Sequence, residues 1–300
     1  MKRLIVENGK RKIINKKSIK ELINTKGFIR LCGAHNAISA KIIEDHGFEA
    51  LWLSSFEMHA SNRLPDADIL NVSDYANAVS KITDRVNIPL VVDGDCGGGS
   101  PINTIRMVRE YEKAGASGIC IEDNLYPKRC SFYSGVSRSL ESPSGHASKI
   151  KAAIENRMSN DFMVIARTES LIAGHGMAEA YSRAEMYVDA GADAVLIHSK
   201  INTPDEIFEF CKTFKEAPVF VVPTKYPQVK EKELIDNGIS GVIYANAGLR
   251  ATIRVLNMVY KILDCEATLK SVDNILTSLP EVYDLVGLED LRENERRYSA

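Results

Sequence analysis

The sequence predicts an α/β fold, a (β/α)8 TIM-type barrel, from three observations. From residue 27 onward, eight short apolar runs alternate with longer amphipathic runs. The short runs are apolar on both faces, as expected of parallel strands that are buried on both sides. The longer runs tend to end in glycine, the residue that adopts the left-handed cap conformation most easily. Eight such units favour a closed barrel, and an open doubly wound sheet is the structural alternative.

The predicted elements follow one another without a low-complexity linker. Strands are expected at 28–36, 49–55, 88–95, 118–123, 161–170, 194–200, 218–225 and 241–248. Helices are expected after them at 37–47, 73–86, 102–115, 146–157, 177–191, 204–214, 231–238 and 249–262. Four of these helices reach their ends at Gly47, Gly115, Gly191 and Gly238.

Other segments lie outside this alternation. We expect a single domain, 1–300, with an N-terminal extension and helix at 1–26, the barrel at 27–268 and a helical tail at 269–300. The tail keeps an apolar pattern after the last strand, so it is expected to pack against the barrel or a neighbouring subunit. The irregular segment 124–145 is far longer than an ordinary strand-to-helix turn. Loops of that length are usually functional lids or disordered.

The composition is that of a globular protein, with 45% hydrophobic and 26% charged residues. A net charge of -2 gives no signature of nucleic-acid or membrane binding, and the basic run 10–17 is interpreted as a solvated face. No apolar run of about 18 residues occurs and the first residues do not resemble a secretory signal, so a cytoplasmic protein is expected. The six cysteines form no CxxC pair, which argues against a zinc knuckle and a disulfide scaffold.

Polar residues gather where the predicted strands end, and in such a barrel these ends share one face. They are Trp52, Ser54 and Ser55, then Asp93 and Asp95, Glu122 and Asp123, Arg167, His198 and Lys200, and finally Thr224 and Lys225. Asp93 and Asp95 would repel each other unless a cation or a shared proton relieved them. Carboxylates without a sulfur or imidazole cluster favour a hard cation, for which Mg²⁺ is the commonest choice.

The same residues indicate a small anionic substrate. A cation held by the carboxylates would polarise a substrate oxygen, and Arg167 offers a planar fork for carboxylate or phosphate. Other interpretations stay open. The two aspartates could cap a helix or a turn, His198 could be a structural histidine, and Arg167 could pair with Glu122 or Glu169. Trp52 is interpreted as a packing residue rather than a catalytic one.

Several motifs are specific enough to compare with known families. They are AHNAISAKIIEDHGFEALWLSS, DGDCGGG, GICIED followed by PKRCS, IARTESLIAGHG, GADAVLIHSK and VVPTKY, within about 27–263. Together they resemble the phosphoenolpyruvate mutase and isocitrate lyase superfamily. HSK and VPTKY are similar to its phosphoenolpyruvate mutase branch, which makes and breaks phosphorus–carbon bonds.

The resemblance implies a Mg²⁺-dependent enzyme that moves a phosphoryl group between the oxygen and the methylene carbon of pyruvate enolate, in a pocket that excludes water. By matching motif, it implies Asp93 as a direct Mg²⁺ ligand and Asp66, Asp95 and Glu122 as ligands through water. It also implies that the backbone amides of Ser54 and Ser55, near Trp52, bind the substrate carboxylate. Arg167 and His198 would contact the carboxylate or the phosphoryl group, and Lys128 would belong to a gating loop.

Two loop positions depart from the mutase pattern. That pattern has a lysine directly after ED and an asparagine two residues after the PK lysine, where this chain has Asn124 and Cys130. A cysteine there resembles the lyase branch, whose KKCGH or KRCGH loop uses the thiol as an acid. The Gly-His that should follow is replaced by Ser131 and Phe132. Cys130 is therefore either a proton donor or a small loop residue.

We expect a phosphoenolpyruvate mutase-like isomerase of phosphonate biosynthesis. One alternative is a phosphonopyruvate hydrolase, which uses the same pocket and admits water. Another is a carbon–carbon lyase of the 2-methylisocitrate lyase type with Cys130 as the acid. A catalytically silent scaffold is disfavoured because the acidic set is complete. The resemblance further implies a homotetramer or a dimer whose C-terminal helices are exchanged between subunits.

Overall fold

The structure of the protein is a computed structural model that describes residues 2–7, 10–131 and 139–299. By internal contacts the chain divides into two compact units. One unit is formed by 17–246, and the other by 1–16 together with 247–300. The contact boundary therefore falls at residue 246, ahead of the last long helix, whereas the sequence placed the end of the barrel at 268.

The larger unit is a closed barrel of parallel strands. Its strands are β3 (Ile29–Gly33), β4 (Ala50–Leu53), β5 (Leu90–Asp93), β6 (Gly118–Glu122), β7 (Met163–Thr168), β8 (Ala194–Ile197), β9 (Val219–Val221) and β10 (Gly241–Tyr244). Consecutive strands are neighbours, and β10 closes the ring by pairing with both β3 and β9. The eight-stranded barrel predicted from the sequence is confirmed among the described residues, and the open sheet is excluded.

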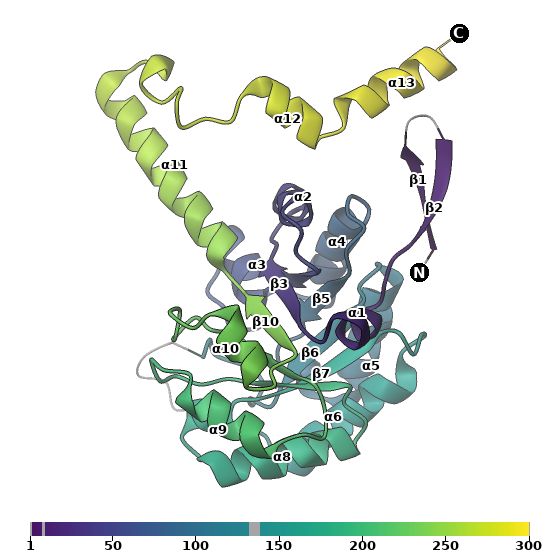
Figure 1. The fold of residues 1–300 in the computed structure, drawn as a ribbon, viewed down its shortest axis with the longest axis vertical. Coiled ribbons are helices and arrows are strands. Elements are labelled where there is room, and N and C mark those ends of the chain that lie inside the picture. The colour runs from purple at the N-terminus through teal and green to yellow at the C-terminus, as the bar shows by residue number, and fades with distance from the viewer. Residues whose placement is uncertain (1, 8–9, 132–138, 300) are drawn as a thin grey trace. The chain divides into compact units, whose positions relative to one another are not determined.

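Helices surround this ring of strands (Figure 1). They are α1 (Ile19–Lys26), α2 (Ala37–Asp45), α3 (Ser55–Ser61), α4 (Val72–Thr83), α5 (Pro101–Lys113), α6 (Pro143–Asn156), α7 (Ser170–Ala173), α8 (Met177–Asp189), α9 (Asp205–Thr213) and α10 (Glu231–Asp236). A single 3₁₀ turn, η1 (Gly97–Gly99), precedes α5. The sequence did not predict the short helices α3 and α7, which directly follow β4 and β7 at the mouth of the barrel.

The barrel interior is apolar along most of its length. One core cluster takes alternating residues from all eight strands, among them Leu31, Trp52, Ile165, Leu196 and Phe220. Alternation selects the face of each strand that points inward. Buried residues of α1 belong to the same cluster, so α1 packs against the interior near the start of β3. With its interior filled by side chains, the barrel leaves room for polar groups only at the ends of its strands.

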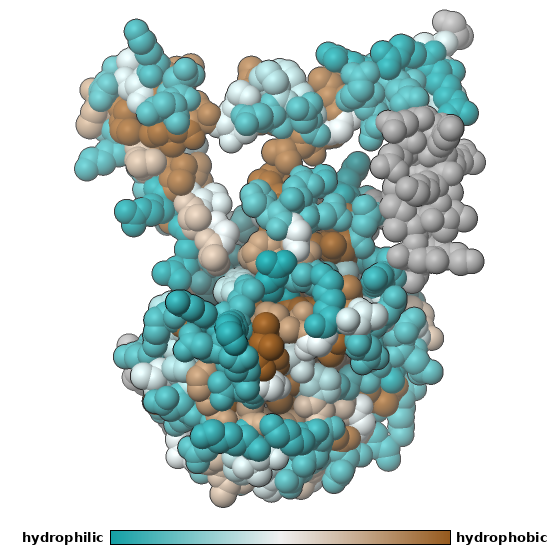
Figure 2. Space-filling model, in the orientation of Figure 1, coloured by the Kyte–Doolittle hydropathy of each residue, from teal (hydrophilic) through white to brown (hydrophobic). Residues whose placement is uncertain are grey.

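The second unit contains a hairpin and the C-terminal helices. Strands β1 (Lys2–Glu7) and β2 (Lys10–Asn15) pair antiparallel, and the helices are α11 (Ala247–Glu266), α12 (Leu279–Leu285) and α13 (Leu288–Tyr298), with the 3₁₀ turn η2 (Leu269–Ser271) between them. Apolar side chains gather on the surface of α11 in Figure 2, where Ile253, Leu256 and Tyr260 are exposed. In the described part of the chain, no helix has the length and apolarity needed to cross a membrane.

Candidate active site

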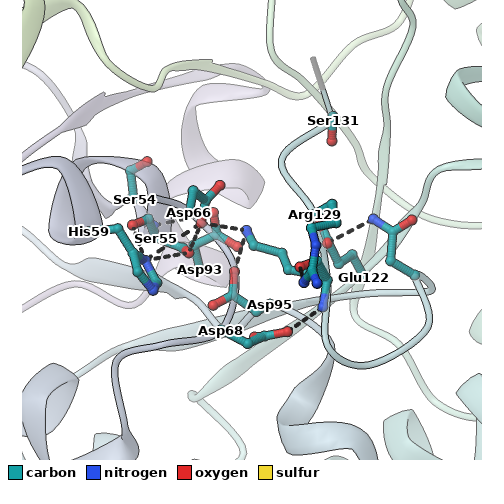
Figure 3. A network of polar contacts seen from close by, with 12 residues as sticks. Ser54, Ser55, His59, Asp66, Asp68, Asp93, Asp95, Glu122, Arg129 and Ser131 are labelled. Carbon is teal, nitrogen blue, oxygen red and sulfur yellow. Dashed lines mark hydrogen bonds and ion pairs between the residues drawn. The ribbon is translucent and has the colours of Figure 1, made fainter. Parts of the chain in front are cut away.

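The polar residues predicted at the strand ends lie at the mouth of the barrel. Because all eight strands are parallel and form one ring, their carboxyl ends meet at one face. Asp93 ends β5, Glu122 ends β6, Arg167 lies one residue before the end of β7, and His198 directly follows β8. The side chains of these residues are buried. Figure 3 shows the acidic part of this group from close by.

An acidic cluster forms the first half of the site, and we define it as Asp66, Asp68, Asp93, Asp95 and Glu122. Asp66 and Asp68 come from the loop between α3 and α4, Asp93 and Glu122 end β5 and β6, and Asp95 follows β5 (Figure 3).

Ser55, at the start of α3, ties two members of the acidic cluster together. Its hydroxyl donates to Asp66 Oδ1 at 2.8 Å, and its backbone amide donates to Asp93 Oδ2 at 3.4 Å. That amide was predicted to hold a substrate carboxylate, and in this structure it faces Asp93 instead. A role of the Ser55 amide in substrate binding therefore requires Asp93 to release it.

Lys128 supplies the positive charge of the acidic cluster. Its ammonium group lies 3.2 Å from Asp66 Oδ1 and forms an ion pair with Asp95. Its backbone amide donates to Asp68, so both ends of the residue are attached to acidic groups. The side chain is only 5% exposed. Burial alone would lower the pKa of Lys128, but Asp95, Glu122 and the other carboxylates raise it well above its usual value.

The ammonium of Lys128 and the guanidinium of Arg167, which lies 3.3 Å from Glu122, do not balance five carboxyl groups. Burial, opposed by Lys128 and reinforced by the neighbouring aspartates, raises the pKa of Asp95 well above its usual value. Burial likewise raises the pKa of Glu122 to about 7, although Arg167 and Lys128 act in the opposite direction. Both shifts have the same main cause, because a poorly solvated place disfavours the charged form, and neighbouring carboxylates add to the effect. The cluster would therefore accept additional positive charge.

His59 holds the loop that carries Asp66 and Asp68. Its Nε2 accepts hydrogen bonds from the backbone amides of Ile69 at 3.1 Å and Leu70 at 3.2 Å. An atom that accepts carries no proton, so Nδ1 carries it and donates to the Ser55 carbonyl oxygen at 2.9 Å. Sequence reasoning missed His59, because a single histidine inside a short helical run gives no signal of this role.

Arg167 is the centre of the second half of the site. Its Nε donates to Glu169 Oε1 at 2.6 Å, and its Nη1 lies 3.3 Å from Glu122 Oε2. Its Nη2 lies 3.0 Å from both Ser131 Oγ and His198 Nδ1. A guanidinium held in this way presents a fixed planar donor to an oxyanion. The alternative pairing of Arg167 with Glu122 or Glu169 is thus present in the structure, with both partners at once.

Glu169 was weighed from the sequence only as a pairing partner, and the structure gives it a wider role. Its Oε1 contacts both Arg167 and His198 Nδ1, the latter at 3.0 Å. Burial would raise the pKa of Glu169, but Arg167, His198 and Ser131 hold it well below the usual range. The residue is therefore a permanent carboxylate that orients both a guanidinium and an imidazole. Its position two residues after Arg167, at the end of β7, was the available sequence signal.

Asp123 lies at a strand end and yet is turned away from the acidic cluster. Its carboxylate accepts hydrogen bonds from Thr168 Oγ1, the Glu169 amide, Arg183 Nη1 and Tyr187 OH, at 2.8 to 3.0 Å. These partners belong to β7, the turn after it and α8. Asp123 therefore fastens the barrel to α8, and its adjacency to Glu122 in the sequence does not make it a site residue.

The segment 124–131, called the lid segment below, covers the site. Asn124 Nδ2 donates to Glu122 Oε1 at 2.8 Å, Lys128 enters the acidic cluster, and Ser131 contacts Arg167. Leu125 is 49% exposed, so the segment has a polar inner side and an outer side that faces solvent. Cys130 is half-buried and in no disulfide. The middle of the predicted loop, including Phe132, lies outside the described residues.

The remaining predicted site residues have structural contacts. Trp52 is 2% exposed and belongs to the apolar interior of the barrel. The Ser54 hydroxyl caps α3 by accepting from the Glu57 amide at 3.4 Å. Their expected contacts with substrate remain predictions.

A cavity of about 640 Å³ adjoins the acidic cluster. Asp93 and Asp95 line it, together with Tyr75, whose hydroxyl is 3.4 Å from Asp95 Oδ2. Arg106 on α5 also lines this cavity. A space of this size accommodates a small molecule. A cation that enters the cavity can contact the carboxylates of Asp93 and Asp95, which line it.

The donor set fits Mg²⁺ in chemistry, although the described residues contain no ready-made group of three metal-binding side chains. Mg²⁺ keeps several waters and is usually bound through one or two carboxylates, so it does not need such a cage. Asp95 Oδ1 is buried without a hydrogen-bond partner among the described residues, and only the ammonium of Lys128 balances its charge. The cluster thus offers oxygen donors that lack sufficient positive charge.

Comparison with known proteins agrees with this geometry. Residues 19–263 match the model of the family described as phosphoenolpyruvate phosphomutase. The chain is 41% identical over 267 residues to phosphonopyruvate hydrolase of Variovorax sp. (strain Pal2), covering 88% of this chain and 92% of the relative.

Solved structures of a phosphoenolpyruvate phosphomutase and of a phosphonopyruvate hydrolase are similar to this chain. A phosphoenolpyruvate phosphomutase from Streptomyces platensis subsp. rosaceus superimposes with a TM-score of 0.92 at 38% identity, covering 94% of this chain and 98% of the other. A phosphonopyruvate hydrolase in complex with oxalate and Mg²⁺ superimposes with a TM-score of 0.86 at 39% identity, covering 91% and 95%. The family resemblance seen in the sequence motifs is confirmed: this chain belongs to the phosphoenolpyruvate phosphomutase family, within the phosphoenolpyruvate mutase and isocitrate lyase superfamily.

Proposed function

We propose that the protein is a Mg²⁺-dependent enzyme of phosphonate metabolism that interconverts phosphoenolpyruvate and phosphonopyruvate. In the direction from phosphonopyruvate, the phosphorus–carbon bond breaks and its electron pair remains on pyruvate as the enolate. The enolate oxygen then forms a bond to the same phosphoryl group. No proton enters or leaves, so the site needs no general acid for this reaction. It must hold two anionic fragments together and exclude water.

The burial of the Lys128 side chain on the inner side of the lid segment is the observation that carries this proposal. The lysine side chain is 5% exposed and lies against the acidic cluster, so the lid segment separates the site from solvent at that point. A phosphoryl group in transit is hydrolysed if water reaches it, and a closed site favours transfer back to the enolate. Leu125, which is 49% exposed, lies on the outer surface of the same segment.

The residues divide into two roles in this proposal. Asp93 would hold Mg²⁺ directly, with Asp66, Asp95 and Glu122 acting through water, and the cation would supply charge stabilisation for the enolate oxygen. The other residues act on the substrate itself. Arg167 and His198 would bind its carboxylate or phosphoryl group, and Glu169 holds both side chains in place.

Hydrolysis of phosphonopyruvate is the second candidate, and the 41% identity to a phosphonopyruvate hydrolase favours it. In that reaction water supplies an oxygen to the phosphoryl group, and the enolate carbon takes up a proton to give pyruvate. Asn124 and Cys130 stand where the mutase pattern has lysine and asparagine, so the lid segment is the part of the site that differs from that pattern. The two reactions share one pocket and differ in whether water enters it.

The exposed apolar surface of the C-terminal helices supports a further part of the proposal, that the protein is a homo-oligomer. Leu279, Val282, Tyr283 and Val286 are exposed on or beside α12 within one compact unit. Apolar surface of this kind is usually covered in an assembly. We expect a dimer or tetramer in solution, as measured by light scattering after size-exclusion chromatography. A monomer at micromolar concentration would contradict this part of the proposal.

The reaction itself is tested by phosphorus NMR. Phosphonopyruvate incubated with the protein and Mg²⁺ should be converted into phosphoenolpyruvate, because the closed site returns the phosphoryl group to the enolate. Omitting Mg²⁺ and adding a chelator should stop the conversion. Inorganic phosphate with pyruvate as the main products would instead establish the hydrolase. Pyruvate released from 2-methylisocitrate would establish the lyase.

Replacing Lys128 tests the charge balance of the acidic cluster. Without Mg²⁺, Lys128→Met should lower the melting temperature by roughly 5 °C, because buried carboxylates lose their cation. Millimolar Mg²⁺ should then stabilise the variant more than the wild type, since the cation no longer competes with an ammonium group. Lys151→Met is the control, because the Lys151 side chain is 66% exposed and pairs with Glu155 within α6. Equal Mg²⁺-induced shifts in wild type and Lys128→Met would contradict the expectation.

Replacing Cys130 separates isomerisation from reactions that end in protonation. Cys130→Ala should keep conversion of phosphonopyruvate to phosphoenolpyruvate within about threefold of wild type, because phosphoryl transfer needs no proton donor. A loss of about a hundredfold or more in this conversion would contradict the expectation. The same loss in release of pyruvate from 2-methylisocitrate would instead identify the thiol as an acid and favour the lyase alternative. Cys211→Ala provides a control for thiol removal, since Cys211 is buried in α9, away from the strand ends that form the site.

A further inference from the structure

Ser131, at the end of the lid segment, contacts the two charged residues that form the second half of the site. Its hydroxyl donates to Glu169 Oε2 at 2.7 Å and accepts from Arg167 Nη2 at 3.0 Å. A hydroxyl group can do both at once, because it carries one proton and two lone pairs. Ser131 therefore bridges an acid and a base that also contact each other directly.

The partners of the guanidinium show what this bridge adds. Arg167 Nε donates to Glu169, and Nη2 donates to the Ser131 hydroxyl. Nη2 also lies 3.0 Å from His198 Nδ1, which in turn lies 3.0 Å from Glu169 Oε1. Nη1 faces Glu122. Glu169 and Glu122 lie on the barrel itself, so they hold one side of the guanidinium whatever the lid segment does. Among these contacts of Arg167 within the described residues, the hydroxyl of Ser131 is the one that comes from the lid segment.

Loss of this hydroxyl would leave two buried charged groups less well satisfied. Glu169 Oε2 accepts from Ser131, and Glu169 Oε1 is already shared by Arg167 and His198. An N–H of Arg167 would at the same time lose its acceptor. Loss of a hydrogen bond to a charged group costs more than loss of one between neutral groups. The orientation of the guanidinium thus depends on a residue that sequence analysis treated only as a departure from the lyase pattern.

We propose that Ser131 is a positioning residue that couples the lid segment to the anion-binding arginine. With the lid segment on the site, the hydroxyl fixes the Nη2 side of Arg167 and holds the guanidinium in the plane that an oxyanion requires. With the lid segment raised, Arg167 keeps only its contacts to the barrel and binds an anion more weakly. The ligand class is a small dianion with a carboxylate or phosphoryl group.

This inference rests on the proposed function in one respect only, that a small anion binds at Arg167. It does not depend on whether the reaction is isomerisation or hydrolysis. Coupling between two sites is reciprocal in binding free energy. An anion at Arg167 must therefore also hold the lid segment down, and the same hydroxyl must transmit both effects.

A pair of isosteric variants gives the sharpest test. Ser131→Thr keeps the hydroxyl. Ser131→Val has the shape of the threonine variant, with a methyl group in place of the hydroxyl. Binding of oxalate with saturating Mg²⁺, measured by calorimetry, should be weakened about tenfold in Ser131→Val and in Ser131→Ala, and should be near wild type in Ser131→Thr. Leu125→Ala, a change on the exposed side of the same segment, should leave oxalate binding unchanged.

Hydrogen exchange supplies a readout that a packing role would not alter. Oxalate should slow amide exchange in 124–131 of the wild type and of Ser131→Thr, and should lose this effect in Ser131→Val. Melting temperatures establish that each variant is folded. Oxalate binding by Ser131→Ala equal to wild type would overturn the inference, as would equal losses in the Thr and Val variants. Absence of turnover by the wild type would instead count against the proposed function and leave this comparison intact.

Discussion

The crowding of five carboxyl groups at one end of a closed barrel is the constraint on which the site depends. Parallel strands in a ring bring Asp93 and Glu122 to one mouth, and a loop held by His59 adds two further aspartates. Burial at that mouth makes their mutual repulsion costly. Lys128 from the lid segment reduces this repulsion. The net charge of the site therefore depends on the position of the lid segment.

Arg167 needs negative partners, whereas the carboxylates of the acidic cluster need positive ones. A buried guanidinium needs acceptors, and it finds Glu122 on one side and Glu169 on the other. Glu122 thereby belongs to both halves of the site, since it also lies close enough to raise the pKa of Lys128. A change in the charge of the acidic cluster is therefore felt at the arginine. This connection places cation binding and anion binding next to each other, as an enolate with a phosphoryl group requires.

Much of the architecture could be predicted because it follows from local patterns. Doubly apolar strands, amphipathic helices and terminal glycines are visible along the chain, and Gly47, Gly115 and Gly191 do adopt positive φ values of 75°, 102° and 101°. The hairpin β1–β2 was missed although its two strands flank an Asn-Gly dipeptide, a common hairpin signal. The charges around that dipeptide were interpreted as a solvated face, and the alternation of polar and apolar residues was overlooked.

The order of residues along the chain was enough to place Asp93, Glu122, Arg167 and His198 at strand ends, because strand periodicity and parallel pairing are short-range properties. It did not reveal that Asp123 turns toward α8 or that Ser131 reaches Glu169. Those contacts join residues 60 and 38 positions apart, and their direction is set by which partner is buried beside them. Side-chain orientation at a barrel mouth arises from packing between distant segments, and only the folded chain contains that information.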